Sequence, residues 1–207
     1  MGPRIFIIGF NKTATRSLHG FFKKNKLPSV HWDNHRLAKT FERNKVLGNK
    51  LLTDGTTRYG REYEKITVFS DITNAATLQE SMHYYKDLDR DYPGSKFILN
   101  IRDTDSWINS RFNHARGALY RQHLKYLALP DNHAGRDTLR QVYRTMHENH
   151  HKDVINHFKN RENDLVIYNI HEDKIIKIVK FLEDHYTLNP KHWSHDGRTK
   201  KRDRRFS

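Results

Sequence analysis

The chain has 207 residues, of which 38 are lysine or arginine and 24 are aspartate or glutamate, and its formal net charge is +14. This length suits one domain with one sizeable core, so we expect residues 1–207 to form a single domain with a basic tail at about 198–207. Cysteine is absent, which excludes disulfides, thiol catalysis and zinc sites built on thiolates. The apolar runs are too short to cross a bilayer, and residues 1–20 lack the long apolar stretch of a signal peptide. We therefore expect a soluble, cytoplasmic protein.

The excess of positive charge indicates an anionic partner. Nucleic acid, a phosphorylated small molecule and an acidic glycan all meet this requirement. The basic residues are spread along the chain apart from a final cluster at 200–205, and a tail of that kind is most often simply solvated.

Short apolar segments alternate with segments of helical pattern along the chain. Four of the five apolar segments are continuous runs, which is typical of strands covered on both faces. The predicted strands span 4–9, 29–32, 66–71, 96–102 and 164–169. The predicted helices span 17–26, 34–47, 74–88, 104–118, 137–159 and 173–185. The sequence therefore predicts an α/β fold, a three-layer domain with a mainly parallel sheet of about five strands, in which ligands bind at the carboxyl ends of the strands.

The loop after the first predicted strand has the composition of an anion site. It reads Phe10-Asn11-Lys12-Thr13-Ala14-Thr15-Arg16-Ser17-Leu18 and leads into a helix. Unpaired backbone N–H groups and the positive end of the helix favour an anion there. Lys12 and Arg16 add full charges, and Thr13, Thr15 and Ser17 add hydroxyl groups.

A nucleoside-triphosphate P-loop does not fit this loop. Counted from Gly9, the positions that need Gly, Lys and Ser or Thr hold Ala14, Thr15 and Arg16. An ordinary capped start of a helix is the simpler alternative.

The loop resembles the Pro-Lys-x-Gly-Thr-Thr-x-Leu loop of the sulfotransferases, whose fold is similar to that of the P-loop proteins. The resemblance implies that residues 12–17 hold the 5′-phosphosulfate end of 3′-phosphoadenosine 5′-phosphosulfate. Two positions depart from the family pattern. Ala14 replaces the usual Gly, so we expect its backbone to avoid conformations that only Gly tolerates. Arg16 replaces the second Thr and can still meet a phosphate through its guanidinium group.

A second stretch resembles the family's 3′-phosphate signature, an Arg at a strand end and a Ser eight residues later. Arg102 and Ser110 have that spacing. A helix that starts near Asp103 places Ser110 two turns along, about 11 Å up the axis. The alternative is that Arg102 forms a local salt bridge with Asp103 or Asp105.

Two further stretches resemble the family more weakly. Tyr168, in the last predicted strand, is expected either near the adenine or in the core. Asp196-Gly197-Arg198-Thr199 resembles the basic loop that closes over the nucleotide, which makes Arg198 a candidate phosphate contact.

The resemblance implies transfer of a sulfuryl group from this donor to an acceptor hydroxyl or amine, with adenosine 3′,5′-bisphosphate as the other product. Lys12 would stabilise the charge on the departing phosphate, and no metal is required. A general base is also needed. Asp71 is the first candidate, His31 and Asp33 are alternatives, and both aspartates could instead be helix caps. The acceptor is left open between an anionic glycan and a small molecule.

Two other functions remain as alternatives. His147-Glu148-Asn149-His150-His151 matches the H-E-x-x-H pattern of zinc hydrolases, with His157 as a third ligand, but Val154 stands where the chain would need a glycine to turn. The charge alone also permits a nucleic-acid-binding protein, although no recognisable module supports one.

Overall fold

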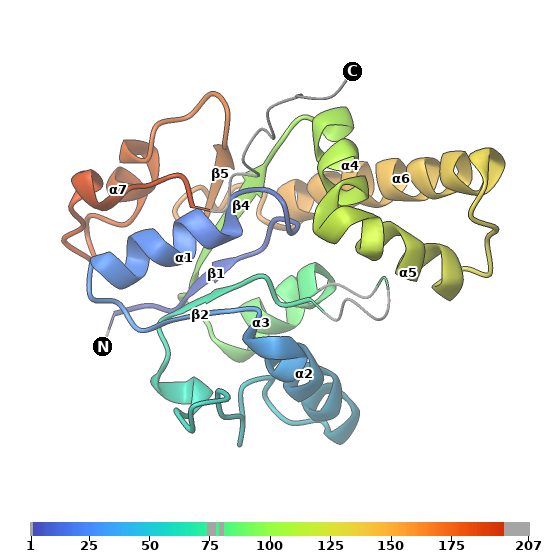
Figure 1. Cartoon of the computed structure of the whole chain (residues 1–207). Coiled ribbons are helices and arrows are strands. Elements are labelled where there is room, and N and C mark those ends of the chain that lie inside the picture. The colour runs from blue at the N-terminus through green and yellow to red at the C-terminus, as the bar shows by residue number, and fades with distance from the viewer. Residues whose placement is uncertain (1, 74–77, 79–80, 197–207) are drawn as a thin grey trace.

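The computed structural model describes residues 2–73, 78 and 81–196. Its centre is a sheet of five parallel strands in the order β2-β3-β1-β4-β5 (Figure 1). The strands are β1 (Ile5–Ile7), β2 (Ser29–His31), β3 (Val68–Ser70), β4 (Lys96–Ile101) and β5 (Leu165–Asn169). Each lies inside a predicted strand segment, so the predicted α/β fold with a parallel sheet is confirmed.

Seven α-helices are assigned among the described residues. They are α1 (Thr15–Lys24), α2 (Arg36–Leu47), α3 (Tyr85–Asp91), α4 (Thr104–Phe112), α5 (Ala118–Tyr126), α6 (His133–His157) and α7 (Ile176–Phe181). Short 3₁₀ helices cover Asp33–His35, Tyr63–Lys65, Ser81–Tyr84, His114–Gly117 and Pro190–His192. Within the described ranges, none of the helices combines the length and the apolar character that crossing a membrane would require.

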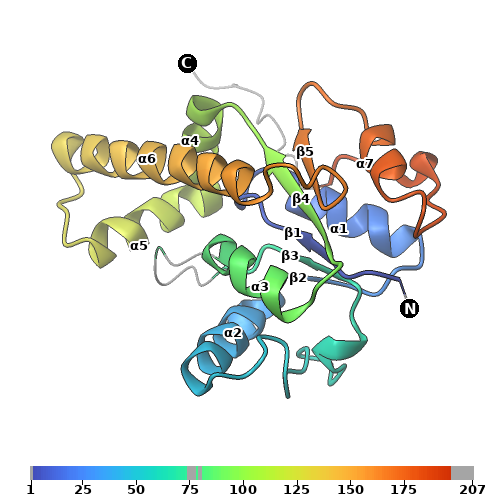
Figure 2. The ribbon, with the colours of Figure 1, turned by 180° about the vertical axis from the view of Figure 1, so that it is seen from behind.

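The helices cover both faces of the sheet, because neighbouring residues of each strand point to opposite sides. Ile5 and Ile7 of β1 pack in one cluster with α1 and α7, which lie on the near face in Figure 1. Phe6 and Ile8 pack in a second cluster with α2, α3 and the end of α6, and Figure 2 shows α3 and α6 on that face. Burial on both sides explains why these strands are continuous apolar runs.

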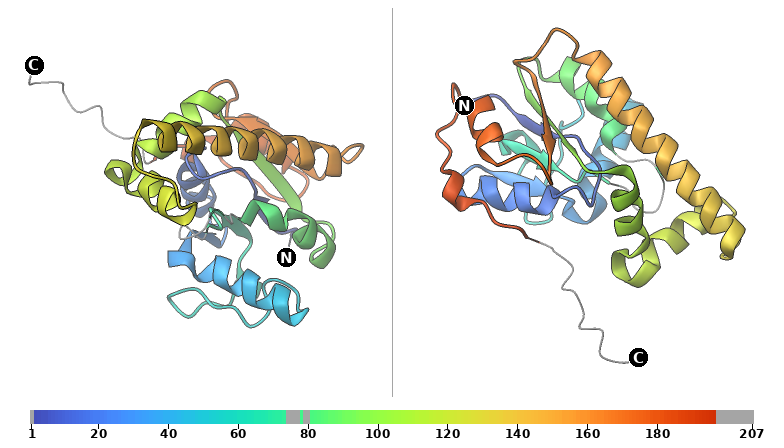
Figure 3. Two further views of the ribbon diagram at one scale, coloured as in Figure 1. Left: turned by 90° about the vertical axis from the view of Figure 1, so that its right-hand side faces the viewer. Right: turned by 90° about the horizontal axis from the view of Figure 1, so that it is seen from above.

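A third cluster of buried residues lies beside the sheet. It joins Trp107 of α4, Leu124 of α5 and Tyr143 of α6 to Phe10 from the loop after β1. Figure 3 shows α4, α5 and α6 side by side in this group. The loop after β1 therefore rests on a helical layer as well as on the sheet.

Several helices differ from the predicted spans. The helix predicted over 104–118 ends at Phe112, because Ala115 (φ 49°) and Arg116 (φ 58°) adopt left-handed conformations that an α-helix cannot contain. The next residues form α5, which the sequence pattern did not predict. The final predicted helix, 173–185, shortens to α7, while part of the predicted helix 74–88 lies outside the described residues.

The histidines of the H-E-x-x-H segment pack inside the protein. His147 stacks on Trp107, with ring centroids 4.5 Å apart, and its Nδ1 lies 3.1 Å from the Thr104 hydroxyl. His150 donates from Nε2 to the Ile8 carbonyl (2.8 Å). His157 pairs instead with Asp89 (2.8 Å). In the part of the chain that the structure describes, no group of three or more metal-ligating side chains is placed to hold an ion.

We expect the free energy of unfolding to fall as the pH falls below about 6.5. Burial lowers the pKa of His150 to about 3, so the folded chain leaves this imidazole neutral while the unfolded chain takes up a proton near pH 6.5. One such group changes the free energy of unfolding by up to about 1.4 kcal/mol per pH unit between the folded and the unfolded pKa of the imidazole. Above pH 6.5 the imidazole is neutral in both states and its titration has no effect on stability. Urea unfolding between pH 7 and pH 4.5 measures this slope.

The variant His150→Gln keeps an N–H donor for the Ile8 carbonyl but cannot titrate, so its pH dependence should be shallower. His171→Gln, at an exposed position, is the control and should follow the wild type. Equal slopes for all three proteins would contradict the assignment of this pH dependence to His150.

Candidate functional site

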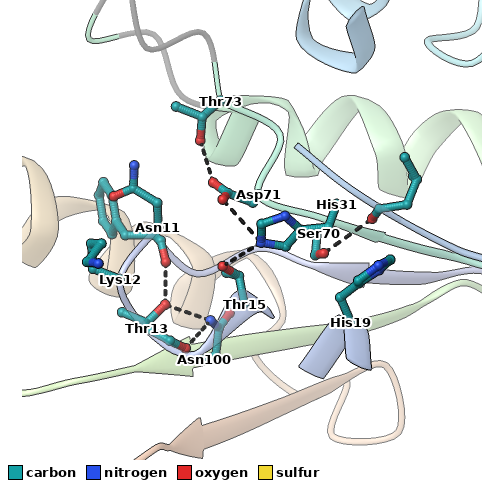
Figure 4. Close-up of polar contacts among 12 residues, drawn as sticks. Asn11, Lys12, Thr13, Thr15, His19, His31, Ser70, Asp71, Thr73 and Asn100 are labelled. Carbon is teal, nitrogen blue, oxygen red and sulfur yellow. Dashed lines mark hydrogen bonds and ion pairs between the residues drawn. The ribbon is translucent and has the colours of Figure 1, made fainter. Parts of the chain in front are cut away.

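The loop between β1 and α1 lies at the carboxyl edge of the sheet, where the strand order reverses direction. The strands β2 and β3 lie on one side of β1, and β4 and β5 lie on the other. Open parallel sheets bind ligands at such a switch point. Figure 4 shows Asn11, Lys12, Thr13 and Thr15 of the loop beside Asn100 of β4, with His31 and Asp71 from the ends of β2 and β3 near Thr15.

The backbone of this loop is left-handed at two positions. Lys12 has φ 68° and Ala14 has φ 65° with ψ 22°. The prediction that Ala14 avoids the glycine-like region is therefore wrong: Ala14 occupies it as the N-cap of α1, at a cost of roughly 1–2 kcal/mol. The first backbone bond of α1 runs from the Leu18 N–H to the Ala14 carbonyl (3.0 Å). The earlier N–H groups of the helix thus face the loop without an intrahelical partner, which favours an anion.

Asn100 in β4 holds the loop in this shape. Its Oδ1 accepts the Gly9 N–H (2.9 Å), and its Nδ2 donates to the Thr13 carbonyl (2.7 Å) and the Thr13 hydroxyl (2.6 Å). The Thr13 hydroxyl in turn donates to the Phe10 carbonyl. Only glycine fits at position 9, because a Cβ there would lie 2.0 Å from the Asn100 carbonyl oxygen. Thr13 therefore stabilises the loop internally.

The helix α4 holds the other end of the loop through Asn11. The Trp107 Nε1–H donates to the Asn11 carbonyl (2.9 Å), and Arg111 Nη1 donates to Asn11 Oδ1 (3.1 Å). Arg111 is fully buried, with its guanidinium carbon 4.9 Å from the Trp107 ring centroid and 4.5 Å from that of Tyr143. The sequence analysis missed both residues, and the only signal was their place in the helix after β4.

The two cations that the sequence analysis singled out meet at the loop. Arg102, directly after β4, donates from Nη1 to the Lys12 carbonyl (3.3 Å). The Lys12 Nζ lies 3.4 Å from Nδ1 of His114. Burial, and then the charges of Arg102 and Arg16, lower the pKa of Lys12, while the carboxylate of Asp71 opposes them. Positive charge is therefore concentrated beside the N-terminus of α1.

Arg102 makes no local salt bridge with the two aspartates that follow it. Asp103 caps α4 by accepting the Ser106 N–H (2.8 Å), and Asp105 pairs with Arg144. The nearest hydroxyl partner of Arg102 is Ser106, whose Oγ lies 2.9 Å from Nε. Ser110 lies one turn further along α4 on the same side of the helix and is half-buried.

Asp71 and His31 come together at the carboxyl ends of β3 and β2. The His31 Nε2 lies 3.2 Å from Asp71 Oδ2 and 3.2 Å from the Thr15 hydroxyl. The Thr73 hydroxyl donates to the other Asp71 oxygen (2.9 Å). Burial lowers the pKa of His31, although Asp71 acts in the opposite direction. A neutral His31 with its proton on Nε2 can donate to Asp71 and hold that carboxylate next to the loop (Figure 4).

Asp33 is not brought to the loop in this way. Its Oδ2 accepts a hydrogen bond from the Tyr63 hydroxyl (2.6 Å), and its Oδ1 accepts the Arg58 N–H (3.2 Å). The side chain is buried, and both oxygens are engaged in tying the segment after β2 to residues 58–63. In this geometry Asp33 has a structural role.

Tyr168 belongs to β5, and its side chain points into the core, where Trp193 packs against it. It is 1% exposed and packs at 6.2 Å, edge to face, on Trp193. Burial raises its pKa to about 12. Of the two alternatives for this residue, the structure shows core packing.

The Ser17 hydroxyl joins α1 to the end of the described chain. It accepts the Asp196 N–H (2.9 Å) and donates to the Asp196 carbonyl (3.2 Å). Of the remaining loop residues, Thr15 is buried and Arg16 is exposed. Arg198, the other predicted phosphate contact, lies outside the described residues.

A cleft of about 520 Å³ lies at the opposite edge of the sheet. Arg4, Thr67 and Ser95, which precede β1, β3 and β4, are among its lining residues, and no residue of the loop is. It therefore takes no part in the site around Lys12.

We expect Asn100→Ala to lower the free energy of unfolding by about 2–4 kcal/mol, because it removes three hydrogen bonds and leaves buried polar groups of Gly9 and Thr13 without a partner. Urea unfolding followed by tryptophan fluorescence measures the loss. Asn156→Ala, at an exposed position on α6, is the matched control and should change stability by less than about 0.5 kcal/mol. Similar stabilities for the two variants would contradict the role given to Asn100.

Comparison with known proteins agrees with this geometry. Residues 4–192 match a family model described as "Sulfotransferase domain". The chain matches no curated protein. The matched region contains every strand of the sheet, the loop around Lys12, and Arg102.

Proposed function

Because the chain belongs to the sulfotransferase family, we propose that it transfers a sulfuryl group from 3′-phosphoadenosine 5′-phosphosulfate to a hydroxyl or amine of an acceptor. The observation that carries this proposal is the meeting of Lys12 and Arg102 at the N-terminus of α1. Two cations and a row of unpaired N–H groups at one point suit a ligand with several anionic groups.

The residues around the loop fit such a donor. The N–H groups at the start of α1, the Lys12 ammonium and the exposed Arg16 would bind the 5′-phosphosulfate. Arg102 would bind the 3′-phosphate together with a hydroxyl of α4, for which Ser110 and Ser106 lie on the same side of the helix. The 5′-phosphosulfate end of the donor is therefore assigned to the loop, and its 3′-phosphate is assigned to Arg102 and α4.

The proposed chemistry needs charge stabilisation and one proton transfer. The acceptor oxygen or nitrogen forms a bond to sulfur while the bond between sulfur and the bridging oxygen breaks. The electron pair of the broken bond stays on that oxygen, which becomes part of the 5′-phosphate of the product. Lys12 and the loop N–H groups would stabilise this developing charge, which is commonly the largest contribution in such sites.

Asp71 is the proposed general base, and it would take the proton that the acceptor loses. Its carboxylate is held by His31 and Thr73, and its negative charge acts to raise the pKa of Lys12. His31 is then a positioning residue for that carboxylate. We do not give this role to Asp33, because hydrogen bonds from Tyr63 and Arg58 engage both of its oxygens.

We expect Lys12→Ala to lower the rate of labelled-sulfate transfer by at least about 100-fold, since it removes the cation assigned to the departing oxygen.

Arg102→Ala should mainly weaken binding of adenosine 3′,5′-bisphosphate, by about tenfold or more, because it removes a charge-assisted contact to phosphate. Calorimetry measures the affinity, with ATP as the competing nucleotide. Lys152→Ala, at an exposed position of α6, is the control for loss of one positive charge.

Failure of the wild-type protein to bind the bisphosphate more tightly than ATP would contradict the proposed donor. Wild-type turnover and affinity in both variants would contradict the assignment of Lys12 and Arg102.

We expect Asp71→Asn to lower turnover by about 10²- to 10⁴-fold and to remove the fall in rate at acidic pH that protonation of a general base produces. The pH profile of sulfate transfer at saturating donor tests both effects. Asp33→Asn is the matched control: it weakens contacts to Tyr63 and Arg58, so it should lower stability and leave the acidic limb in place. An unchanged acidic limb in Asp71→Asn would move the base elsewhere.

A further inference from the structure

A cavity of about 400 Å³ lies between the end of α4, the start of α5 and the first turns of α6. Its volume is within the range of small-ligand sites. It lies outside the donor site described above and belongs to the group formed by α4, α5 and α6 in Figure 3.

Two aromatic rings in this cavity hold guanidinium groups in place. Phe112 and Tyr120 are stacked, with centroids 4.9 Å apart and planes inclined by 13°. The Arg140 guanidinium carbon lies 4.3 Å from the Phe112 centroid, and those of Arg121 and Arg136 lie 5.3 Å and 5.5 Å from the Tyr120 centroid. Contact with ring faces orients a guanidinium and leaves most of its five N–H donors at the edges.

The carboxylates near the cavity already have partners of their own. Asp137 pairs with His133 (2.7 Å) and Asp131 pairs with Arg136 (2.7 Å). Arg140 donates to the Asn109 side-chain oxygen (3.0 Å) and forms no ion pair with a carboxylate of the described residues. The Arg140 guanidinium thus keeps a full charge and free donors for an anionic ligand.

Arg121 does not line the cavity but lies next to it, against the Tyr120 ring. It donates to the Arg116 carbonyl (2.9 Å), lies 3.4 Å from the Tyr120 hydroxyl, and has no carboxylate partner among the described residues. The cavity therefore offers one oriented cation, Arg140, and a second one, Arg121, lies beside it at Tyr120. Neutral groups hold both. A carboxylate or sulfate group matches such donors in charge and in geometry.

The cavity lining includes a sequence neighbour of His114, the residue that contacts Lys12 at the proposed reaction centre. Asn113 lines it, and the next residue, His114, reaches to 3.4 Å from the Lys12 Nζ. The Cα atoms of Phe112 and His114 are separated by at most about 8 Å, since consecutive Cα atoms are about 3.8 Å apart. The three-residue segment 112–114 therefore joins the cavity lining to the surroundings of the Lys12 ammonium.

We propose that this cavity binds a carboxylate or sulfate group of the acceptor, so that the substrate class is an acidic acceptor. The identification of the ligand as an acceptor rests on the proposed function. The anion site itself is argued from Arg140, from Arg121 beside it and from the two rings. The part of the acceptor that reacts would lie beside Lys12, and the anionic group would lie against Arg140.

The test uses calorimetry with three disaccharides of similar size as probes. The first is heparin-derived and carries a carboxylate and sulfate groups, the second is its desulfated form, and the third is the uncharged N,N′-diacetylchitobiose. We expect the charged probes to bind and the uncharged one to bind at least about tenfold more weakly, with affinities that fall as salt is added. Comparison of the first two probes tells whether sulfate or carboxylate is preferred.

Arg140→Gln should weaken binding of the charged probes by at least about tenfold. Arg144→Gln is the matched control, one turn along α6 and outside the cavity, and should bind like the wild type. Arg121→Gln, an exposed position, provides a second test in case Arg140→Gln does not fold. Arg102→Ala should not change probe binding, which separates the cavity from the donor cations.

Equal losses in Arg140→Gln and Arg144→Gln, or equal binding of the charged and uncharged disaccharides, would overturn the proposal, as would the absence of any binding by the charged probes. Titration of the same proteins with adenosine 3′,5′-bisphosphate distinguishes the two proposals. If the bisphosphate does not bind, the proposed function fails. If it binds normally while the acidic probes do not, only the acceptor site fails.

Discussion

The shape of the loop after β1 depends on one buried amide, that of Asn100. This side chain extends from β4 and forms hydrogen bonds with Gly9 and Thr13 of the loop after β1. It thereby links two strands that are adjacent in the sheet, although Gly9 and Asn100 are 91 residues apart in the sequence. Its three hydrogen bonds help to hold Lys12 and Ala14 in left-handed conformations that neither residue prefers. Without that shape the first N–H groups of α1 and the Lys12 side chain would not face the same point.

Hydrogen bonds from two sides hold the loop. Asn100 holds the backbone at Thr13, and Trp107 with Arg111 holds it at Asn11. These residues belong to the strand and the helix on either side of Arg102, so the same elements that shape the loop also bring the second cation to it. Preorganised donors of this kind stabilise charge without reorganising during a reaction.

The sequence predicts the parts of this arrangement that depend on local pattern. Short apolar segments, four of them continuous runs, identified the five strands, and the small and charged residues of 10–18 identified the loop. The contacts of Asn100 and Arg111 could not be predicted, because they join residues about 90 to 100 positions apart and each residue type is common in other settings. Ala14 was predicted wrongly for a related reason: its local preference opposes the left-handed conformation, and the tertiary contacts of the loop outweigh that preference.

The charges at the site act on one another as well as on a ligand. Burial lowers the pKa of Lys12, and repulsion by Arg102 and Arg16 lowers it further, while Asp71 compensates only in part. An anion bound among these cations would remove the repulsion and stabilise the charged form of Lys12. Occupation of the loop by an anion therefore favours the protonated lysine, which is the form that the proposed role of Lys12 requires.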